Sequence, residues 1–312
     1  MGSRWARIGR RSCSLVRSAL VRSLVSLGGV DRIGGEVPLT ECRNPSGAMS
    51  TATLTTSAPE SAHDGDRTLA QLSLLGGFSL VIGDRRCSLP QGSERLVALL
   101  AVRPRGLRRG AISGTLWPES DDLRASAALR STLTRLRRIG RTIVDSGSGV
   151  LGLGKDVDVD ISGARGLAER AIQGKMLATD LATTSIATLS FDLLPGWYED
   201  WVILEAEDWR QVRLHALESL SATLTQKGRF AHAISAAMAA IRGDPWRESA
   251  RQALVRTHLA ENNQSEAIRE FDRYRNLLKG ELGLEPSRDF VRLVGGRESL
   301  RRCDAGRNRQ WK

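Results

Sequence analysis

The sequence predicts a mainly α-helical protein with a small β component: a winged helix-turn-helix domain followed by an α-helical, tetratricopeptide-like domain. Three observations predict this fold class. A segment in which apolar and polar residues alternate around glycine turns precedes three helical segments. A short hairpin pattern follows these helices. A long helical region then contains two units with similar sequence patterns. Each pattern is common, so the order in which they occur carries the prediction.

The segment 122–140 has the clearest pattern. Leu129, Leu133 and Leu136 recur at the spacing that lines one side of an α-helix. Small side chains on the other side would let this helix approach base edges, and guanidinium groups would pair with guanine or with phosphate. The alternative is a surface helix with solvated arginines. The residues predicted to contact DNA from this helix are Arg124, Ala127, Arg130, Ser131, Thr134, Arg135 and Arg138.

The elements before this helix are predicted from glycine and proline. Residues 69–90 alternate apolar and polar positions around two glycine turns, which indicates a small antiparallel meander. A first helix is predicted over 93–102 and ends before Pro104, since proline lacks an amide donor and restricts the residue before it. A second, short helix is predicted over 109–117. Ser120 is the predicted N-cap of the third helix.

A hairpin pattern follows the third helix. Residues 142–145 and 150–153 read as two strands joined by a turn over 146–149. This hairpin would be the wing, reaching the minor groove or the backbone of DNA. Ser146 and Ser148 are its predicted DNA-contacting residues.

Charge is distributed unevenly along the 312 residues, whose net charge is +11. Residues 69–160 contain 14 basic and 9 acidic residues, a net charge of +5, whereas residues 161–294 contain 17 and 18, a net charge of −1. A basic module beside a nearly neutral one indicates a nucleic-acid binder with an attached regulatory or interaction domain.

The two ends of the chain are expected to be disordered and mostly basic. Residues 1–68 form a basic and polar leader, and residues 295–312 a basic tail. Residues 1–48 allow three interpretations: a targeting segment, a disordered basic arm, or a translated upstream region with the native start at Met49. The polar segment that follows Met49 favours the third interpretation.

Residues 161–294 are helical by pattern. The Ala-Ile pairs at 233 and 267 lie 34 residues apart, each after a short turn, and 34 is the period of tetratricopeptide helix pairs. Four tryptophans in this region are expected to be core or interdomain anchors, because the region is not basic. They are Trp197, Trp201, Trp209 and Trp246.

Several short motifs resemble those of the streptomycete-type antibiotic regulatory proteins. The matching segments are Leu75-Gly76-Gly77-Phe78, Leu116-Trp117-Pro118-Glu119, Arg124-Ala125, Leu129-Arg130, Leu136-Arg137-Arg138, Leu194-Pro195-Gly196-Trp197-Tyr198-Glu199-Asp200-Trp201 and Glu281-Leu282-Gly283-Leu284-Glu285-Pro286. The resemblance covers residues 69–294. It departs from the family at 125–128, where an Asn often precedes the first leucine of the recognition helix, and this leaves the target sequence open.

The resemblance implies an OmpR-like winged helix over 69–160 and a bacterial transcriptional activation domain over 161–294. It further implies a transcriptional activator of secondary metabolism or a related pathway. The implied partners are double-stranded DNA with direct repeats near a promoter, RNA polymerase holoenzyme, and a second copy of the chain as a homodimer on DNA.

Other classes of function lack their motifs. The sequence contains no GxxxxGK[ST] loop for nucleotide phosphates and no HExxH, and its four histidines have no ligand spacing, so we expect no cofactor, no metal and no enzymatic activity. The four cysteines form no CxxC pair and no apolar run approaches membrane-spanning length, which favours a cytoplasmic protein without membrane contact. The main alternative is a helical-repeat adaptor whose winged module does not bind DNA.

Overall fold

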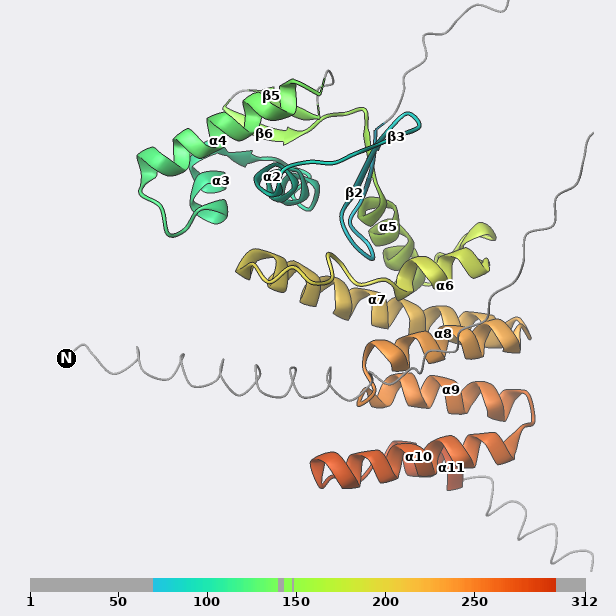
Figure 1. Cartoon of the computed structure of the whole chain (residues 1–312). Helices are drawn as coiled ribbons and strands as arrows, with labels where there is room; N and C mark the ends of the chain where they lie inside the picture. Colours follow the sequence, from blue (N-terminus) through green and yellow to red (C-terminus); the bar gives the residue numbers. More distant parts are fainter. Residues whose placement is uncertain (1–69, 140–142, 148, 296–312) are drawn as a thin grey trace, which may run out of the picture. The chain divides into compact units, whose positions relative to one another are not determined.

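The computed structural model describes residues 70–139, 143–147 and 149–295, which belong to one compact unit. Helices dominate, and the strands are short and confined to the first half of the described region (Figure 1). The predicted fold class is therefore confirmed. The predicted division into domains at residue 160, and the two predicted disordered ends, stay predictions.

A four-stranded sheet begins the described region. It comprises β1 (Ala70–Ser73), β2 (Ser79–Ile82), β3 (Arg85–Cys87) and β7 (Val157–Val159), in the order β3-β2-β1-β7. The first three strands form the predicted antiparallel meander, whereas β7 pairs in parallel with β1.

The helix-turn-helix lies between the strands of this sheet in the sequence. Helix α2 (Gln91–Ala101) is followed by β4 (Leu107–Arg108), α3 (Arg109–Leu116) and α4 (Asp122–Arg137). Strands β5 (Val144–Gly147) and β6 (Val150–Leu153) then join β4 in a second sheet, in the order β4-β6-β5. Helices and hairpin thus have the order of a winged helix.

Gly106 permits the close approach of β4 to β6. Its φ angle is +68°, and a Cβ atom at this position would lie 2.7 Å from the backbone oxygen of Leu151. Only glycine combines this backbone conformation with so little space.

The structure corrects three details of the sequence interpretation. The N-cap of α4 is Asp121 and not Ser120: the Asp121 carboxylate accepts a hydrogen bond from the backbone N–H of Arg124 at 2.8 Å. Strand β5 extends to Gly147, so Ser146 lies in a strand rather than in the turn. The two-residue strand β4 was not predicted.

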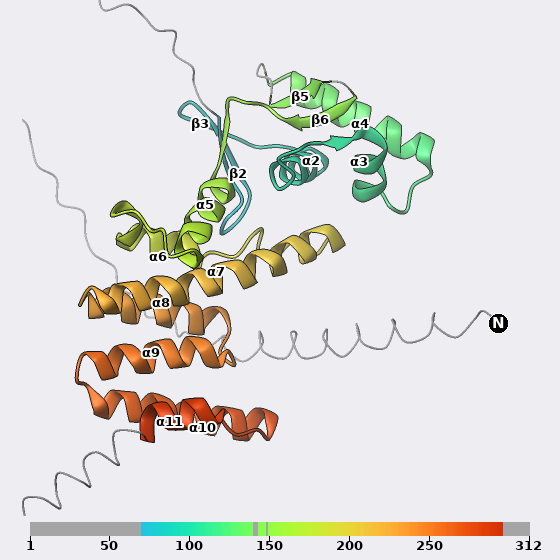
Figure 2. The same ribbon diagram turned by 180° about the vertical axis from the view of Figure 1, so that it is seen from behind.

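The rest of the described chain is helical. Its elements are α5 (Asp160–Ile172), the 3₁₀ turn η1 (Thr179–Leu181), α6 (Thr183–Ser190), α7 (Asp200–Gln226), α8 (Phe230–Gly243), α9 (Glu248–Ala260), α10 (Gln264–Leu282) and α11 (Arg288–Gly295). Helices α7 to α10 pack consecutively, each against the next, in both views (Figures 1 and 2).

The 34-residue echo corresponds to equivalent positions in two helices. Ala233 is the fourth residue of α8 and Ala267 the fourth residue of α10, and both are completely buried. A larger side chain would separate the packed helices at these points. The predicted tetratricopeptide-like packing is confirmed.

Three of the four expected tryptophan anchors are buried or half-buried. Trp201 and Trp209 are core residues, and Trp197 is half-buried against Phe78. The expectation for Trp246 is wrong, because 46% of its surface is exposed.

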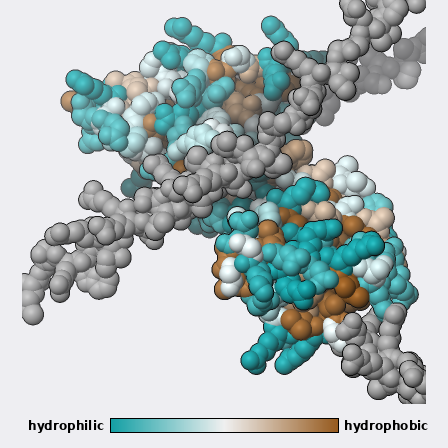
Figure 3. Space-filling view, turned by 60° about the horizontal axis from the view of Figure 1, so that its bottom comes forward, coloured by the Kyte–Doolittle hydropathy of each residue, from teal (hydrophilic) through white to brown (hydrophobic). Residues whose placement is uncertain are grey.

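The far end of the helical array carries exposed apolar side chains. Figure 3 looks toward this end and shows hydrophobic residues among hydrophilic ones. Those exposed on α10, α11 and the segment between them are Ile268, Leu282, Leu284 and Val291.

The first sheet is joined to the helical region through backbone bonds. Leu75 forms an isolated β-bridge with Leu193, and the N–H of Leu194 donates to the oxygen of Leu74 at 2.9 Å. The N–H of Gly76 donates to the oxygen of Asp192 at 2.8 Å. One continuous core accompanies these bonds, since buried residues from Ala70 to Leu254 form a single cluster.

Asp160, at the start of α5, also fixes this junction. Its carboxylate accepts hydrogen bonds from the backbone N–H groups of Leu74 and Leu75, each at 3.0 Å. Burial raises the pKa of this carboxyl group, and the two N–H donors oppose that rise only in part. The native state therefore holds the Asp160 proton more firmly than the unfolded chain does.

The raised pKa of Asp160 leads to a prediction about pH. In the window from the ordinary carboxyl pKa of about 4 up to the raised native value, the unfolded chain has lost this proton and the native state has not, so the contribution of Asp160 to stability should fall as pH rises. Asp160→Asn cannot ionise, so its stability should lack this part of the pH dependence.

Urea unfolding of the wild type and Asp160→Asn across pH 3.5–7 measures this difference. Asp156→Asn is the matched control, because Asp156 is exposed and its carboxylate accepts no hydrogen bond among the described residues. Parallel pH profiles for the wild type and Asp160→Asn would contradict the prediction.

Candidate nucleic-acid interface

Helix α4 is anchored by its apolar side. Ala125, Leu129, Leu133 and Leu136 are buried, and Thr132 is buried with its hydroxyl donating to the oxygen of Ala128 at 2.9 Å. Because these positions recur every three or four residues, the helix has one fixed inner side. The other side is left facing solvent.

Every predicted contact residue on α4 or at its end is exposed. The structure thus places the predicted DNA-contacting residues of this segment on the exposed side of one helix or at its end. Exposure alone does not show that they contact DNA. The exposed residues are Arg124, Ala127, Arg130, Ser131, Thr134, Arg135 and Arg138.

Two members of this set have partners within the helix. The guanidinium of Arg124 lies 3.3 Å from the carboxylate of Asp121, but both side chains are largely exposed, so the pair is weak. The Thr134 hydroxyl donates to the oxygen of Arg130 at 2.9 Å, which leaves only its lone pairs for another donor.

The remaining arginines of the set are unpaired. Among the described residues, the guanidinium groups of Arg130, Arg135 and Arg138 have no ion-pair or hydrogen-bond partner. Arginines of the helical region behave differently, since most of them pair with a carboxylate. Those pairs are made by Arg165, Arg170, Arg210, Arg213, Arg247, Arg251, Arg269, Arg273, Arg275 and Arg292. Within the described region, unpaired arginines are therefore concentrated in the part before α5, and those of α4 and its end are among them.

The predicted wing is described except at its tip. Ser146 is exposed and lies opposite Leu151 in the β5–β6 ladder. Ser148 lies outside the described residues. Gly149, beside it, has a φ angle of +80°, which fits a tight turn.

Further exposed residues near this surface were not predicted. Arg137, Arg108 and Arg109 are exposed and unpaired within the described region, and Arg108 belongs to β4, which pairs with the wing strand β6. Leu123, at the start of α4, is 85% exposed. The short strand gave no sequence signal that would have linked Arg108 and Arg109 to the wing.

The described residues also bear on metal binding and on membrane insertion. No group of three or more His, Cys, Asp or Glu side chains is placed to hold a metal ion there. No helix of the described region combines the length and hydrophobicity needed to cross a membrane.

Comparison with known proteins gives one family and two regulatory relatives. Residues 167–295 match the family described as bacterial transcriptional activator domain. Regulatory protein AfsR of Streptomyces coelicolor is 29% identical over 209 residues, which cover 63% of this chain and 21% of that protein. Regulatory protein AfsR of Streptomyces griseus is 27% identical over 216 residues, which cover 65% of this chain and 22% of that protein. The chain thus spans about a fifth of the length of these relatives.

A solved structure shares the fold. The structure of Mycobacterium tuberculosis EmbR in complex with a low-affinity phosphopeptide aligns with a TM-score of 0.53 and 18% identity, over 72% of this chain and 64% of EmbR. Residues 167–295 therefore match a bacterial transcriptional activator domain, and about two thirds of the chain is similar in sequence to two regulatory proteins.

Proposed function

We propose that this protein is a sequence-specific activator of transcription that binds double-stranded DNA through α4 and the β5–β6 wing. The observation that carries the proposal is the row of exposed arginines on α4 that lack partners among the described residues. Guanidinium groups without carboxylate partners are free to pair with phosphate oxygens or with guanine, and exposed Ala127 and Ser131 between them allow close approach to base edges.

The helical region would then contact the transcription machinery. We propose that it recruits RNA polymerase holoenzyme to promoters with direct repeats, on which two copies of the chain bind as a homodimer. The match of residues 167–295 to an activator domain supports this role, as does the nearly neutral charge of the region, which is ill suited to binding DNA itself. The resemblance of the sequence motifs to the streptomycete-type antibiotic regulatory proteins suggests genes of secondary metabolism or a related pathway as targets.

Selection of DNA from a random library by the full chain tests the proposal. We expect an enriched sequence with a direct repeat, and an affinity for it that falls by orders of magnitude between low and about 0.5 M salt, because phosphate contacts release counterions. A transcription assay with purified polymerase on the selected sequence should then show activation. Failure to enrich any sequence, together with partner binding that survives 0.5 M salt, would favour a helical-repeat adaptor instead.

A further inference from the structure

The first turn of α4 carries an apolar side chain that the fold does not use. Leu123 is 85% exposed, the highest value among the large apolar side chains of the described region. The buried side of this helix begins at Ala125 and continues through Leu129, so Leu123 lies outside it. A leucine that remains in water gains nothing from the hydrophobic effect, and packing within the chain therefore does not explain it.

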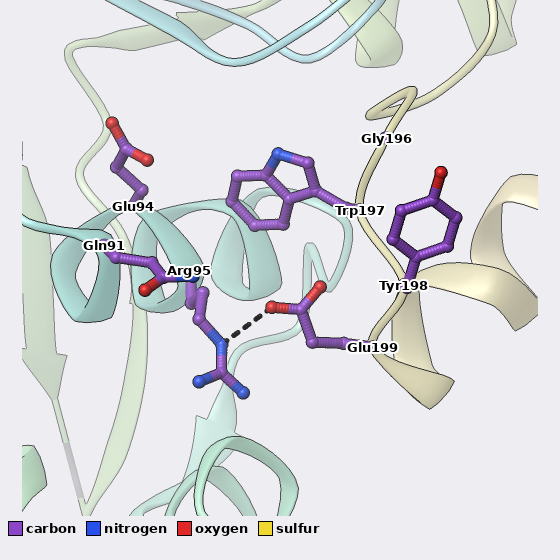
Figure 4. A pocket seen from close by; sticks show the side chains of 7 residues that line it. All are labelled: Gln91, Glu94, Arg95, Gly196, Trp197, Tyr198 and Glu199. Atoms are coloured by element: carbon purple, nitrogen blue, oxygen red, sulfur yellow. Dashed lines mark ion pairs between the residues drawn. The ribbon is translucent and has the colours of Figure 1, made fainter.

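Exposure alone does not make a binding residue, as Tyr198 shows. This ring is 80% exposed and lies at a cavity of about 430 Å³ between α2 and the loop before α7. In Figure 4, Glu94 lies on the opposite side of Trp197 from the Tyr198 ring. The guanidinium of Arg95 is already paired, because its Nε lies 3.0 Å from Glu199. The described lining residues therefore place no second group beside this ring to bind the same ligand.

Leu123 differs from Tyr198 because it belongs to a row of residues along one helix. Ala127, Arg130 and Thr134 follow it at four, seven and eleven positions, a spacing that places all four on one side of α4. All four are exposed, and the Arg130 guanidinium has no partner among the described residues. The row thus begins with two apolar side chains and continues with an unpaired cation and a hydroxyl group.

The charge of the first turn indicates which part of DNA this end of the row could contact. The exposed carboxylates of Asp121 and Asp122 lie beside Leu123 in the sequence and would repel a phosphate group. Base edges are more favourable partners, because the amino group of cytosine is a donor that a carboxylate can accept from. A leucine side chain forms no hydrogen bond. Its match in the major groove is the 5-methyl group of thymine.

We propose that Leu123, with Ala127 beside it, reads thymine in the major groove by packing against the 5-methyl group. The inference rests on the proposed binding of DNA through α4, and it adds a base that the bound sequence must contain. In helix-turn-helix proteins the N-terminal residues of the recognition helix contact base edges, and Leu123 occupies this part of α4. Leu123 and Arg130 are about 10 Å apart along the helix axis, so both would reach bases of the same repeat.

Replacement of thymine by deoxyuridine tests the proposal, because the two bases differ only by this methyl group. The probe is the duplex selected by the full chain, with its thymines replaced one at a time, and fluorescence anisotropy measures the Kd. At one position in each repeat, the replacement should weaken wild-type binding by roughly three- to fivefold, the effect of losing one buried methyl group.

Variants of Leu123 assign this effect to its side chain. The same deoxyuridine replacement should have almost no effect on binding by Leu123→Ala. Leu123→Met keeps an apolar side chain of similar length and should keep the wild-type response. Leu204→Ala is the matched control, since Leu204 is 68% exposed on α7, and it should leave DNA affinity and the deoxyuridine response unchanged. Because Leu123 is so exposed, Leu123→Ala should unfold at the wild-type temperature.

The outcomes separate this inference from the proposed function. DNA binding that is insensitive to deoxyuridine at every position, or a deoxyuridine effect that persists undiminished in Leu123→Ala, would overturn the inference and leave DNA binding in place. Failure of the full chain to select any DNA would overturn both. If Leu123→Ala instead lowered activation by polymerase without changing DNA affinity, the leucine would belong to a protein contact, and the inference would be wrong.

Discussion

Replacing Arg135 and Arg138 together by alanine is expected to weaken binding to the selected DNA sequence by a factor of roughly 30 to 25,000. An arginine that reads a base contributes about 1–3 kcal/mol, and the two effects should add approximately if the contacts are independent. Both side chains are exposed and have no partner among the described residues, so their removal should not disturb the fold. Fluorescence anisotropy titration with labelled DNA measures the loss.

The salt dependence of the same titrations shows what the two arginines contact. If each contacts only phosphate, the slope of log K against log salt should decrease by about 0.9 per arginine, and affinity should fall equally for specific and random DNA. If they read bases, the loss should be larger for the specific sequence. Either result would place α4 on the DNA if the control variant described next loses less affinity.

Arg85 and Arg86 on β3 provide the matched control. They are exposed and lie on a strand of the first sheet, and their replacement by alanine removes the same net charge. Equal losses in the two double variants would mean that net charge alone matters, whereas undiminished binding by the α4 variant would exclude this helix as the reading surface.

The recognition helix could be predicted because its signal is local. The spacing of Leu129, Leu133 and Leu136 fixes one inner side, and whatever occupies the opposite positions must then be exposed. The 34-residue spacing of the Ala-Ile pairs could also be recognised in the sequence. Ala233 and Ala267 must both be small for neighbouring helices to pack. Both patterns can be recognised from spacing along the sequence, without knowing which distant segments pair in the fold.

The missed features depend on pairing between distant segments. Strand β7 pairs in parallel with β1, which lies more than 80 residues earlier, and β4 has only two residues. Neither gives a sequence period. The choice of Asp121 over Ser120 as N-cap is a matter of one residue, and both types are good caps.

The contacts of Arg95 were beyond sequence analysis for the same reason. This side chain bonds to the oxygen of Leu116 at the end of α3 and to Glu199 before α7, two positions far apart in the chain. The expectation for Trp246 was also wrong, because this tryptophan of the helical region was expected in the core and is 46% exposed. Its backbone oxygen accepts a hydrogen bond from the Tyr274 hydroxyl at 3.1 Å.

A buried ion pair links α9 to α10 next to this tyrosine. Arg251 and Glu270 are both buried and form a direct ion pair, and the second oxygen of Glu270 pairs with Arg273. Arg251 also donates to the oxygen of Pro245 at 3.2 Å and lies 5.7 Å from the centre of the Tyr274 ring. Burial raises the pKa of Tyr274 to about 12, so its hydroxyl stays neutral and keeps donating at any ordinary pH.

Glu270→Gln is expected to lower the free energy of unfolding by about 3–5 kcal/mol. The substitution preserves the shape of the side chain but leaves the Arg251 charge buried without a counter-charge, which is far more costly than the loss of an exposed pair. Thermal and urea unfolding, followed by helical circular dichroism, should show the helical region melting at a clearly lower temperature and denaturant concentration.

Two further variants separate the buried charge from other effects. Arg273→Ala should cost less than about 1 kcal/mol, because the Arg273 side chain is 65% exposed and Glu270 keeps its pair with Arg251. Replacing both partners, with Arg251→Met and Glu270→Leu, should restore most of the stability lost in Glu270→Gln, since a well-packed apolar pair needs no counter-charge. If Glu270→Gln instead cost no more than Arg273→Ala, water would have to reach Arg251, and the ion pair would be a surface interaction rather than part of the core between α9 and α10.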